Sequence, residues 1–144
     1  MSTLYISPSI TPTGPQDASQ INIQMAVYRA LTHISGMPPV YDDVPQNAAF
    51  PYIVIGDDTS IAFDDDCGTG FESTITLHVW SIYSGRKEVK DIMGAIYTCL
   101  HRQKLNITGG YLVTMNFEYQ DTLLDPDGVT RHGIIRFRLL TRSI

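Results

Sequence analysis

An abrupt change in hydrophobic period near residue 84 constrains the fold of this chain more than any other feature of its sequence. Residues 71–83 alternate between apolar and polar side chains, which is the period-two pattern of a strand with one face more buried than the other. In residues 85–101 the apolar side chains recur every three or four positions, which predicts a helix with one apolar stripe. Ser84, between the two segments, is the expected helix cap. The stripe consists of Val89, Ile92, Met93, Ile96, Cys99 and Leu100.

The first third of the chain predicts an extended arm followed by another helix. Residues 1–16 hold three of the eight prolines, a composition that supports neither a helix nor an alternating strand, so they are predicted to form an extended N-terminal arm. A helix capped by Asp17 or Ser19 is expected to run to about His33. Four residues at helical spacing form its predicted apolar face: Ile21, Met25, Tyr28 and Leu31.

Three more strands are predicted on either side of the central helix. Residues 52–58 are rich in β-branched side chains and lead into a long acidic loop at 59–70, so this strand and the next are expected to form a hairpin with an extended tip. Residues 111–119 alternate as a third strand, and apolar residues alternate with arginines through 135–139 in a last one. The sequence DPDG at 125–128 predicts the turn between them, since proline suits the second turn position and glycine tolerates positive φ.

The resulting order, α-β-β-α-β-β, is typical of the α+β class. It favours an antiparallel, possibly mixed, sheet of about four strands with two helices packed on one face. A chain of 144 residues fits one domain that can bury a core without disulfides or metals. We therefore expect residues 17–144 to form a single α+β domain.

Charge is distributed unevenly along the chain. Between Arg29 and Arg86 there is no lysine or arginine, although eight of the fifteen acidic residues lie in that interval. Four of the ten basic residues lie in the last fourteen positions. Separated acidic and basic surfaces allow copies of a protein to associate head to tail, although plain solvation of charged loops accounts for the pattern equally well. The candidate interface residues on these surfaces are Asp64, Asp65, Asp66, Arg136 and Arg138.

Composition excludes or disfavours several classes of protein. The net charge of −5 disfavours a nucleic-acid binder that neutralises phosphates with a basic patch. No apolar run is long enough to cross a bilayer, and the N-terminus lacks the features of a signal peptide, so neither a membrane nor an export step is predicted. Cys67 and Cys99 are interpreted as free thiols.

The sequence contains no pattern that predicts catalysis, a cofactor or a metal. Asp64, Asp65, Asp66, Cys67 and His78 are the obvious metal ligands, but three consecutive aspartates point in different directions and lack the alternation of a calcium loop. No nucleophile elbow and no glycine-rich phosphate-binding motif is present. His78 is interpreted as a hydrogen-bonded or interface histidine, and Trp80 as a core or interface residue.

Three segments together resemble the tail-completion, or tail-terminator, proteins of long-tailed bacteriophages, prophages and gene-transfer particles. They are VYDDVPQNAAFPYIVIG (40–56), LHVWSIYSGRKEVKDIMGAIYTCLH (77–101) and DPDGVTRHGIIRFR (125–138). They match in order and spacing, and the resemblance covers about residues 20–142. The arm before residue 20 is longer than expected for this family, and it could strap over an adjacent subunit.

The resemblance implies a structural protein of the virion, made in the host cytoplasm and placed at the head-proximal end of the tail. Members of this family form a ring, usually hexameric, that caps the tail tube and presents a surface to the head-side connector. The implied partners are other copies of the chain, the tail tube protein and a head-tail connector protein. DNA would pass through the lumen without specific binding.

Two loops have expected roles in such a ring. Gln46 and Asn47 offer neutral hydrogen bonds to a neighbouring subunit. The acidic loop 57–72 either lines the lumen, where it would repel the DNA backbone, or meets Arg136 and Arg138 of a neighbour. A head-side connector or stopper is the alternative function within this class, and a small ligand-binding α+β domain is the alternative outside it.

Overall fold

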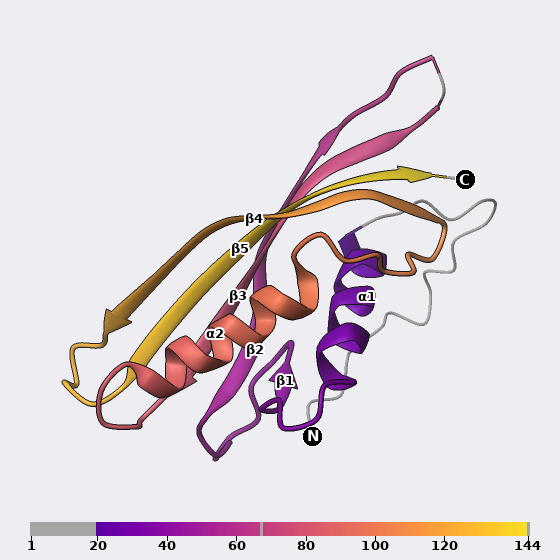
Figure 1. Ribbon diagram of the computed structural model, residues 1–144. Helices are drawn as coiled ribbons and strands as arrows, with labels where there is room; N and C mark the ends of the chain where they lie inside the picture. Colours follow the sequence, from indigo (N-terminus) through magenta and orange to yellow (C-terminus); the bar gives the residue numbers. More distant parts are fainter. Residues whose placement is uncertain (1–19, 67, 144) are drawn as a thin grey trace.

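A mixed β-sheet with both helices on one of its faces forms the protein (Figure 1). The computed structural model describes residues 20–66 and 68–143, so the predicted arm at 1–16, the proposed helix caps Asp17 and Ser19, and Cys67 lie outside the described residues. Within the described part the elements, in chain order, are α1 (Gln20–Thr32), β1 (Val40–Tyr41), β2 (Tyr52–Ala62), β3 (Gly70–Ser81), α2 (Lys87–Leu100), β4 (Gly110–Leu124) and β5 (Arg131–Ser143).

The sheet has five strands in the order β1-β2-β3-β5-β4. The β2–β3 and β4–β5 pairs are the two predicted antiparallel hairpins, and β3 pairs antiparallel with β5 in the centre. The prediction of an antiparallel, possibly mixed, sheet of about four strands is confirmed in part: the sheet is mixed, because β1 adds a fifth strand that runs parallel to β2. A strand of two residues is too short to show an alternation of apolar and polar side chains, so it could not be predicted from the pattern.

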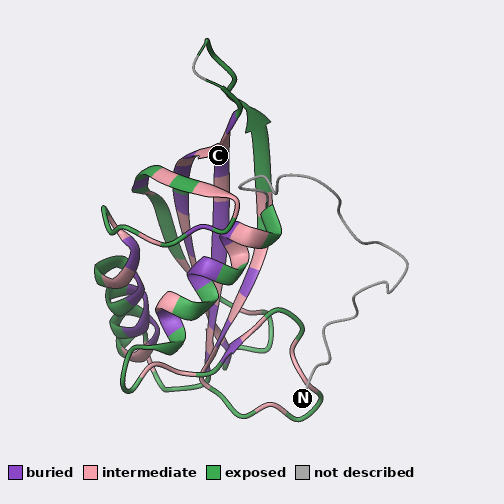
Figure 2. Cartoon of the chain, turned by 90° about the vertical axis from the view of Figure 1, so that its right-hand side faces the viewer, coloured by how far each residue is buried: buried purple, intermediate pink, exposed green. Residues whose placement is uncertain are grey.

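The core lies between the sheet and the helices (Figure 2). The predicted stripe of α2 is confirmed, with Cys99 at its partly buried margin. This helix packs so closely on β5 that a Cβ added at Gly133 would lie 2.7 Å from Val89 Cγ2 and 2.8 Å from Met93 Sδ. The inward residues of the two central strands are almost completely buried, as their alternation predicted: Ile75, Leu77, Val79, Ile135, Phe137 and Leu139.

The predicted apolar face of α1 is wrong for three of its four residues, since only Leu31 is buried. Its buried residues are Ile23, Ala26, Val27 and Leu31, whereas Ile21, Met25 and Tyr28 are 47%, 47% and 46% exposed. Both sets recur at helical spacing, so periodicity alone could not choose between them. The contacts of α1 with α2 and β2 bury the face formed by Ile23, Ala26, Val27 and Leu31.

Several predicted boundaries also differ from the structure; β4, for example, continues to Leu124 and does not end at residue 119. Strand β2 continues to Ala62 and pairs with β3 across the region predicted as a loop, after an irregularity between Gly56 and Thr59. Its outer half is exposed and therefore lacks the alternation of a half-buried strand. Ser84 does not cap α2, which begins at Lys87 after Arg86 without a side-chain cap.

Candidate assembly surface

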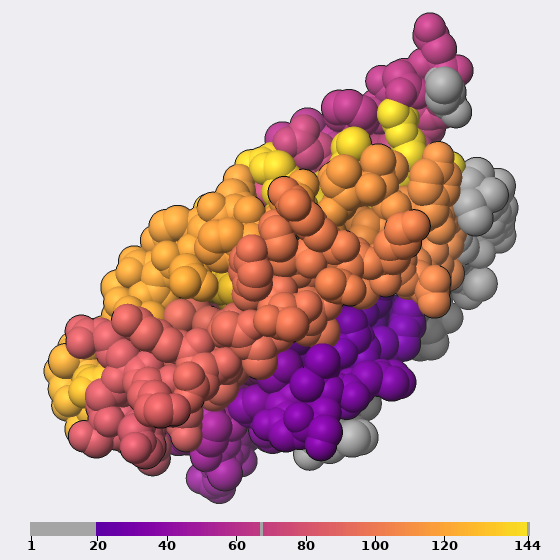
Figure 3. Space-filling view, in the orientation of Figure 1, coloured from indigo at the N-terminus to yellow at the C-terminus, as the bar shows by residue number. Residues whose placement is uncertain are grey.

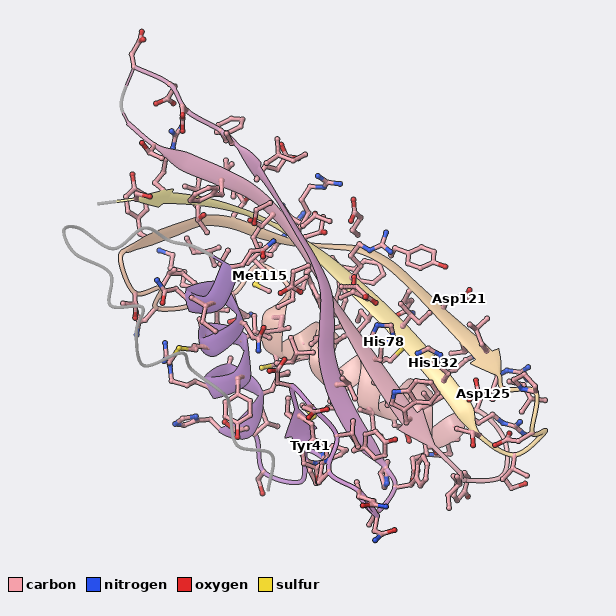
Figure 4. All side chains as sticks on the ribbon, turned by 180° about the vertical axis from the view of Figure 1, so that it is seen from behind. Tyr41, His78, Met115, Asp121, Asp125 and His132 are labelled. Atoms are coloured by element: carbon pink, nitrogen blue, oxygen red, sulfur yellow. The ribbon has the colours of Figure 1, made fainter. Side chains whose placement is uncertain are left out.

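Among the residues that the structure describes, no helix covers one face of the sheet, and we call this face the outer face (Figure 4). Strands β3 and β5 direct alternate side chains to it, and their register places residues distant in sequence next to one another. Trp80 is paired with His132, Thr76 with Arg136, and Thr74 with Arg138. The outer face therefore carries both predicted arginines of the candidate interface.

Arg138 is paired with carboxylates of its own chain. Its Nη1 donates to Glu72 Oε1 at 2.5 Å, and its Nε and Nη2 donate to Glu118 Oε1 at 3.0 and 2.5 Å. The hydrogen bonds that Arg138 donates to Glu118 and, to a smaller extent, to Glu72 raise its pKa above the usual range. A neighbouring subunit would have to displace two carboxylates in order to pair with this guanidinium.

Arg136 has a different environment on the same face. Its Nε donates to Thr76 Oγ1 at 3.2 Å, and its guanidinium carbon lies 5.4 Å from the centre of the Tyr119 ring. Among the described residues it makes no ion pair. It borders a shallow depression of about 430 Å³ that also includes Asp57 and Asp58, so its charge remains available to an acidic partner.

The three consecutive aspartates lie at the tip of the β2–β3 hairpin, which projects beyond the rest of the molecule (Figures 1 and 3). Asp64 Oδ1 accepts a hydrogen bond from the Gly70 N–H at 3.3 Å. Asp65 forms an ion pair with Arg142 of the same chain, and the Arg142 guanidinium also lies 5.2 Å from the Phe63 ring centre. Arg142 was not predicted as a candidate interface residue, although its even spacing from Arg136 and Arg138 places it on the same face of the last strand.

Gln46 and Asn47 lie at the opposite end of β2, in the loop that precedes this strand. Both side chains are exposed, and Asn47 has a positive φ of 65°. The Ala48 N–H donates to the Pro45 carbonyl at 3.2 Å, which closes a tight turn. The candidate interface residues thus fall into three separate regions: the loop, the outer face and the hairpin tip.

A chain of polar contacts on the outer face was not predicted. His78 Nε2 lies 2.7 Å from Asp57 Oδ2, and His78 Nδ1 lies 2.7 Å from His132 Nε2. Trp80 stacks on His132 with a ring separation of 3.8 Å; it therefore lies on the outer face and not under the helices. The interpretation of His78 as a hydrogen-bonded residue is confirmed, but its partner His132 is 54 positions away and only the β3–β5 register reveals it.

The described residues contain no cluster of histidine, cysteine, aspartate and glutamate that could hold a metal ion. No helix in the same ranges is long and apolar enough to cross a membrane.

Comparison with known proteins gives consistent matches. Residues 24–142 match the family model described as tail completion protein gp17. The tail completion protein gp17 of Bacillus phage SPP1 is 35% identical over 89 residues, which cover 62% of this chain and 66% of that protein, just under two thirds of its length.

Two solved structures share the fold. A chain in the virion of a native gene transfer agent particle superposes with a TM-score of 0.78 at 22% identity, over 84% of this chain and 95% of that one. The structure of SPP1 gp17 superposes with a TM-score of 0.57 at 28% identity, over 86% and 89% of the two chains.

Proposed function

This chain belongs to the gp17 family of tail completion proteins and is a structural component of the virion tail, and on that premise we propose that it assembles as a hexameric ring. The ring would cap the head-proximal end of the tail tube, end tail polymerisation and provide the surface that joins the tail to the head. Its partners would be further copies of the chain, the tail tube protein and a head-tail connector protein.

The projecting β2–β3 hairpin is the observation that carries this proposal. Its outer half lies beyond the helices and exposes apolar side chains, with Ile61 63% and Phe63 40% exposed (Figure 3). The Asp65–Arg142 ion pair ties the tip to the end of β5. An ordered projection with exposed apolar residues is suited to a contact with a different surface of the next copy, and such head-to-tail contacts generate rings.

The distribution of charge favours a lumen role for the acidic hairpin. Asp65 and Arg138 already have partners in their own chain, which weakens the drive for an ion pair between subunits. Asp64 and Asp66 make no ion pair within the described residues. Carboxylates lining a lumen would repel the DNA backbone and let it pass without specific binding.

Electron microscopy of the full-length chain mixed with the tail tube protein tests the proposal. We expect a ring at one end of the tubes, with six copies by native mass spectrometry. A ring that binds the portal complex but not the tube would instead support a head-side connector or stopper. A chain that remains monomeric with both partners would contradict the ring, and a shift in melting temperature with one member of a metabolite panel would then support a ligand-binding domain.

A further inference from the structure

The exposed stripe of α1 forms one wall of an apolar groove. Ile21, Met25 and Tyr28 lie along it at successive turns of the helix, each nearly half exposed. The groove has a volume of about 530 Å³, and the buried residues Val40 and Ile55 contribute to its lining from β1 and β2. Three large apolar side chains in one contiguous stripe beside a groove are typical of a surface that another segment covers.

We propose that residues 4–10 of the chain's own N-terminal arm bind in this groove. The segment reads Leu-Tyr-Ile-Ser-Pro-Ser-Ile, so four of its seven residues offer apolar side chains to the α1 stripe. Its proline favours an extended backbone, which lowers the entropy lost on docking.

The charge of the groove also suits this segment. Asp42 and Asp43 outnumber Arg29 among the charged residues of the groove lining, and this excess of negative charge disfavours an acidic occupant. Residues 1–16 contain no aspartate, glutamate, lysine or arginine, so they meet no repulsion there. The hydroxyl groups of Ser7 and Ser9 can donate hydrogen bonds to the two carboxylates.

The connection between the arm and α1 makes binding within one subunit geometrically easy. The arm joins α1 at Gln20, next to Ile21 at one end of the stripe. The ten residue-to-residue steps from Ile10 to Gln20 reach about 33 Å when extended, whereas a helix of 13 residues is about 20 Å long. A tether of this length gives an effective concentration in the millimolar range, which favours the chain's own arm over an arm from another copy.

Photo-crosslinking of the full-length, unassembled chain tests the proposal independently of ring formation. Tyr28→p-benzoylphenylalanine keeps an aromatic side chain in the stripe, and we expect its crosslinks to map to residues 4–10. In a mixture of ¹⁴N- and ¹⁵N-labelled chains, the crosslinked peptides should be of one isotope only. The double substitution Leu4→Asp, Ile6→Asp should reduce the yield by about tenfold or more, because it removes two apolar side chains from the contact.

The matched control places the same probe at Tyr97, which is exposed on α2 away from the groove and should not crosslink to the arm. Circular dichroism verifies that each variant is folded. Crosslinks from position 28 to another segment, crosslinks of mixed isotope, or no crosslink in a folded chain would each overturn the proposal; mixed isotopes would assign the groove to the arm of a second copy.

Discussion

The Nδ1 atom of His78 lies 2.7 Å from the Nε2 atom of His132, although the two residues are 54 positions apart. Asp57 lies within hydrogen-bond distance of the other nitrogen of His78, and only one of the two facing nitrogens of His78 and His132 can carry a proton if their contact is to be kept. The pair therefore couples the packing of the outer face to pH.

We predict that acidification below about pH 6.5 destabilises the protein through this pair. Burial, and secondarily His78, lowers the pKa of His132, while Asp125 opposes the shift. A lowered pKa in the folded state means that the unfolded state binds more protons. The stabilisation is therefore complete above the unfolded pKa of about 6.5 and is lost as pH falls below it. Urea unfolding at pH 7.5 and 5.5 measures the effect.

The substitution His132→Gln isolates this contribution, since it keeps a donor but removes the titration. We expect the urea midpoint of this variant to change less with pH than that of the wild type. Burial raises the pKa of Asp58, so above about pH 4 this carboxyl stabilises the protein as the pH falls, which is opposite to the effect of His132. The wild type and His132→Gln share this contribution, so it cancels in their comparison. His33→Gln, at an exposed site, is the control. Equal pH slopes in the wild type and His132→Gln would refute the prediction.

Gly133→Ala should lower the free energy of unfolding by about 1–3 kcal/mol, the usual effect of overpacking. The new methyl group would meet Val89 and Met93 at distances below 3.0 Å. Gly94→Ala is the matched control, because it lies in α2 with no neighbouring atom within 4 Å and should stabilise the helix by about 0.5–1 kcal/mol. Chemical denaturation of both variants decides the point, and equal stabilities would show that α2 is free to move away from β5.

Asp65→Lys should loosen the hairpin tip because it places a second cation beside Arg142. The free energy of unfolding should change by no more than about 1 kcal/mol, since the Asp65 side chain is 43% exposed and solvent therefore screens its pair with Arg142. Hydrogen exchange at residues 60–72 should accelerate, and ring assembly should weaken. Restoration by Arg142→Glu would support the pair within one chain, whereas restoration only by Arg136→Glu with Arg138→Glu would place the contact between subunits.

Gln46→Ala combined with Asn47→Gly should give a folded chain that assembles poorly. Glycine is chosen at position 47 because the positive φ of Asn47 would strain an alanine. Circular dichroism tests the fold, and native mass spectrometry with the tail tube protein tests assembly. The single variants Asn47→Ala and Asn47→Gly separate backbone strain from loss of the side chain. Strain alone would lower the stability of Asn47→Ala without a comparable loss in Asn47→Gly. Normal assembly of the double variant would exclude this loop from the interface.

The local pattern of the sequence determined the elements that are half buried along their whole length. Strands β3 and β5 and helix α2 show a clear period because one side of each faces the core, so their inward residues could be predicted individually. The DPDG turn was equally predictable, since its backbone is set by its own residues: the Gly128 N–H bonds to the Asp125 carbonyl at 2.9 Å, and Gly128 has a φ of 73°.

The tertiary structure alone decided which of two equivalent stripes α1 buries and which partners the charged residues choose. Helical spacing is the same for both stripes, and only the contact with α2 and β2 distinguishes them. The partners of Arg138, Arg142 and His78 depend on pairing between strands that are far apart in sequence. Sequence alone therefore predicted that the acidic and basic segments exist, but the tertiary structure determined that Arg138 and Arg142 pair with carboxylates of their own subunit.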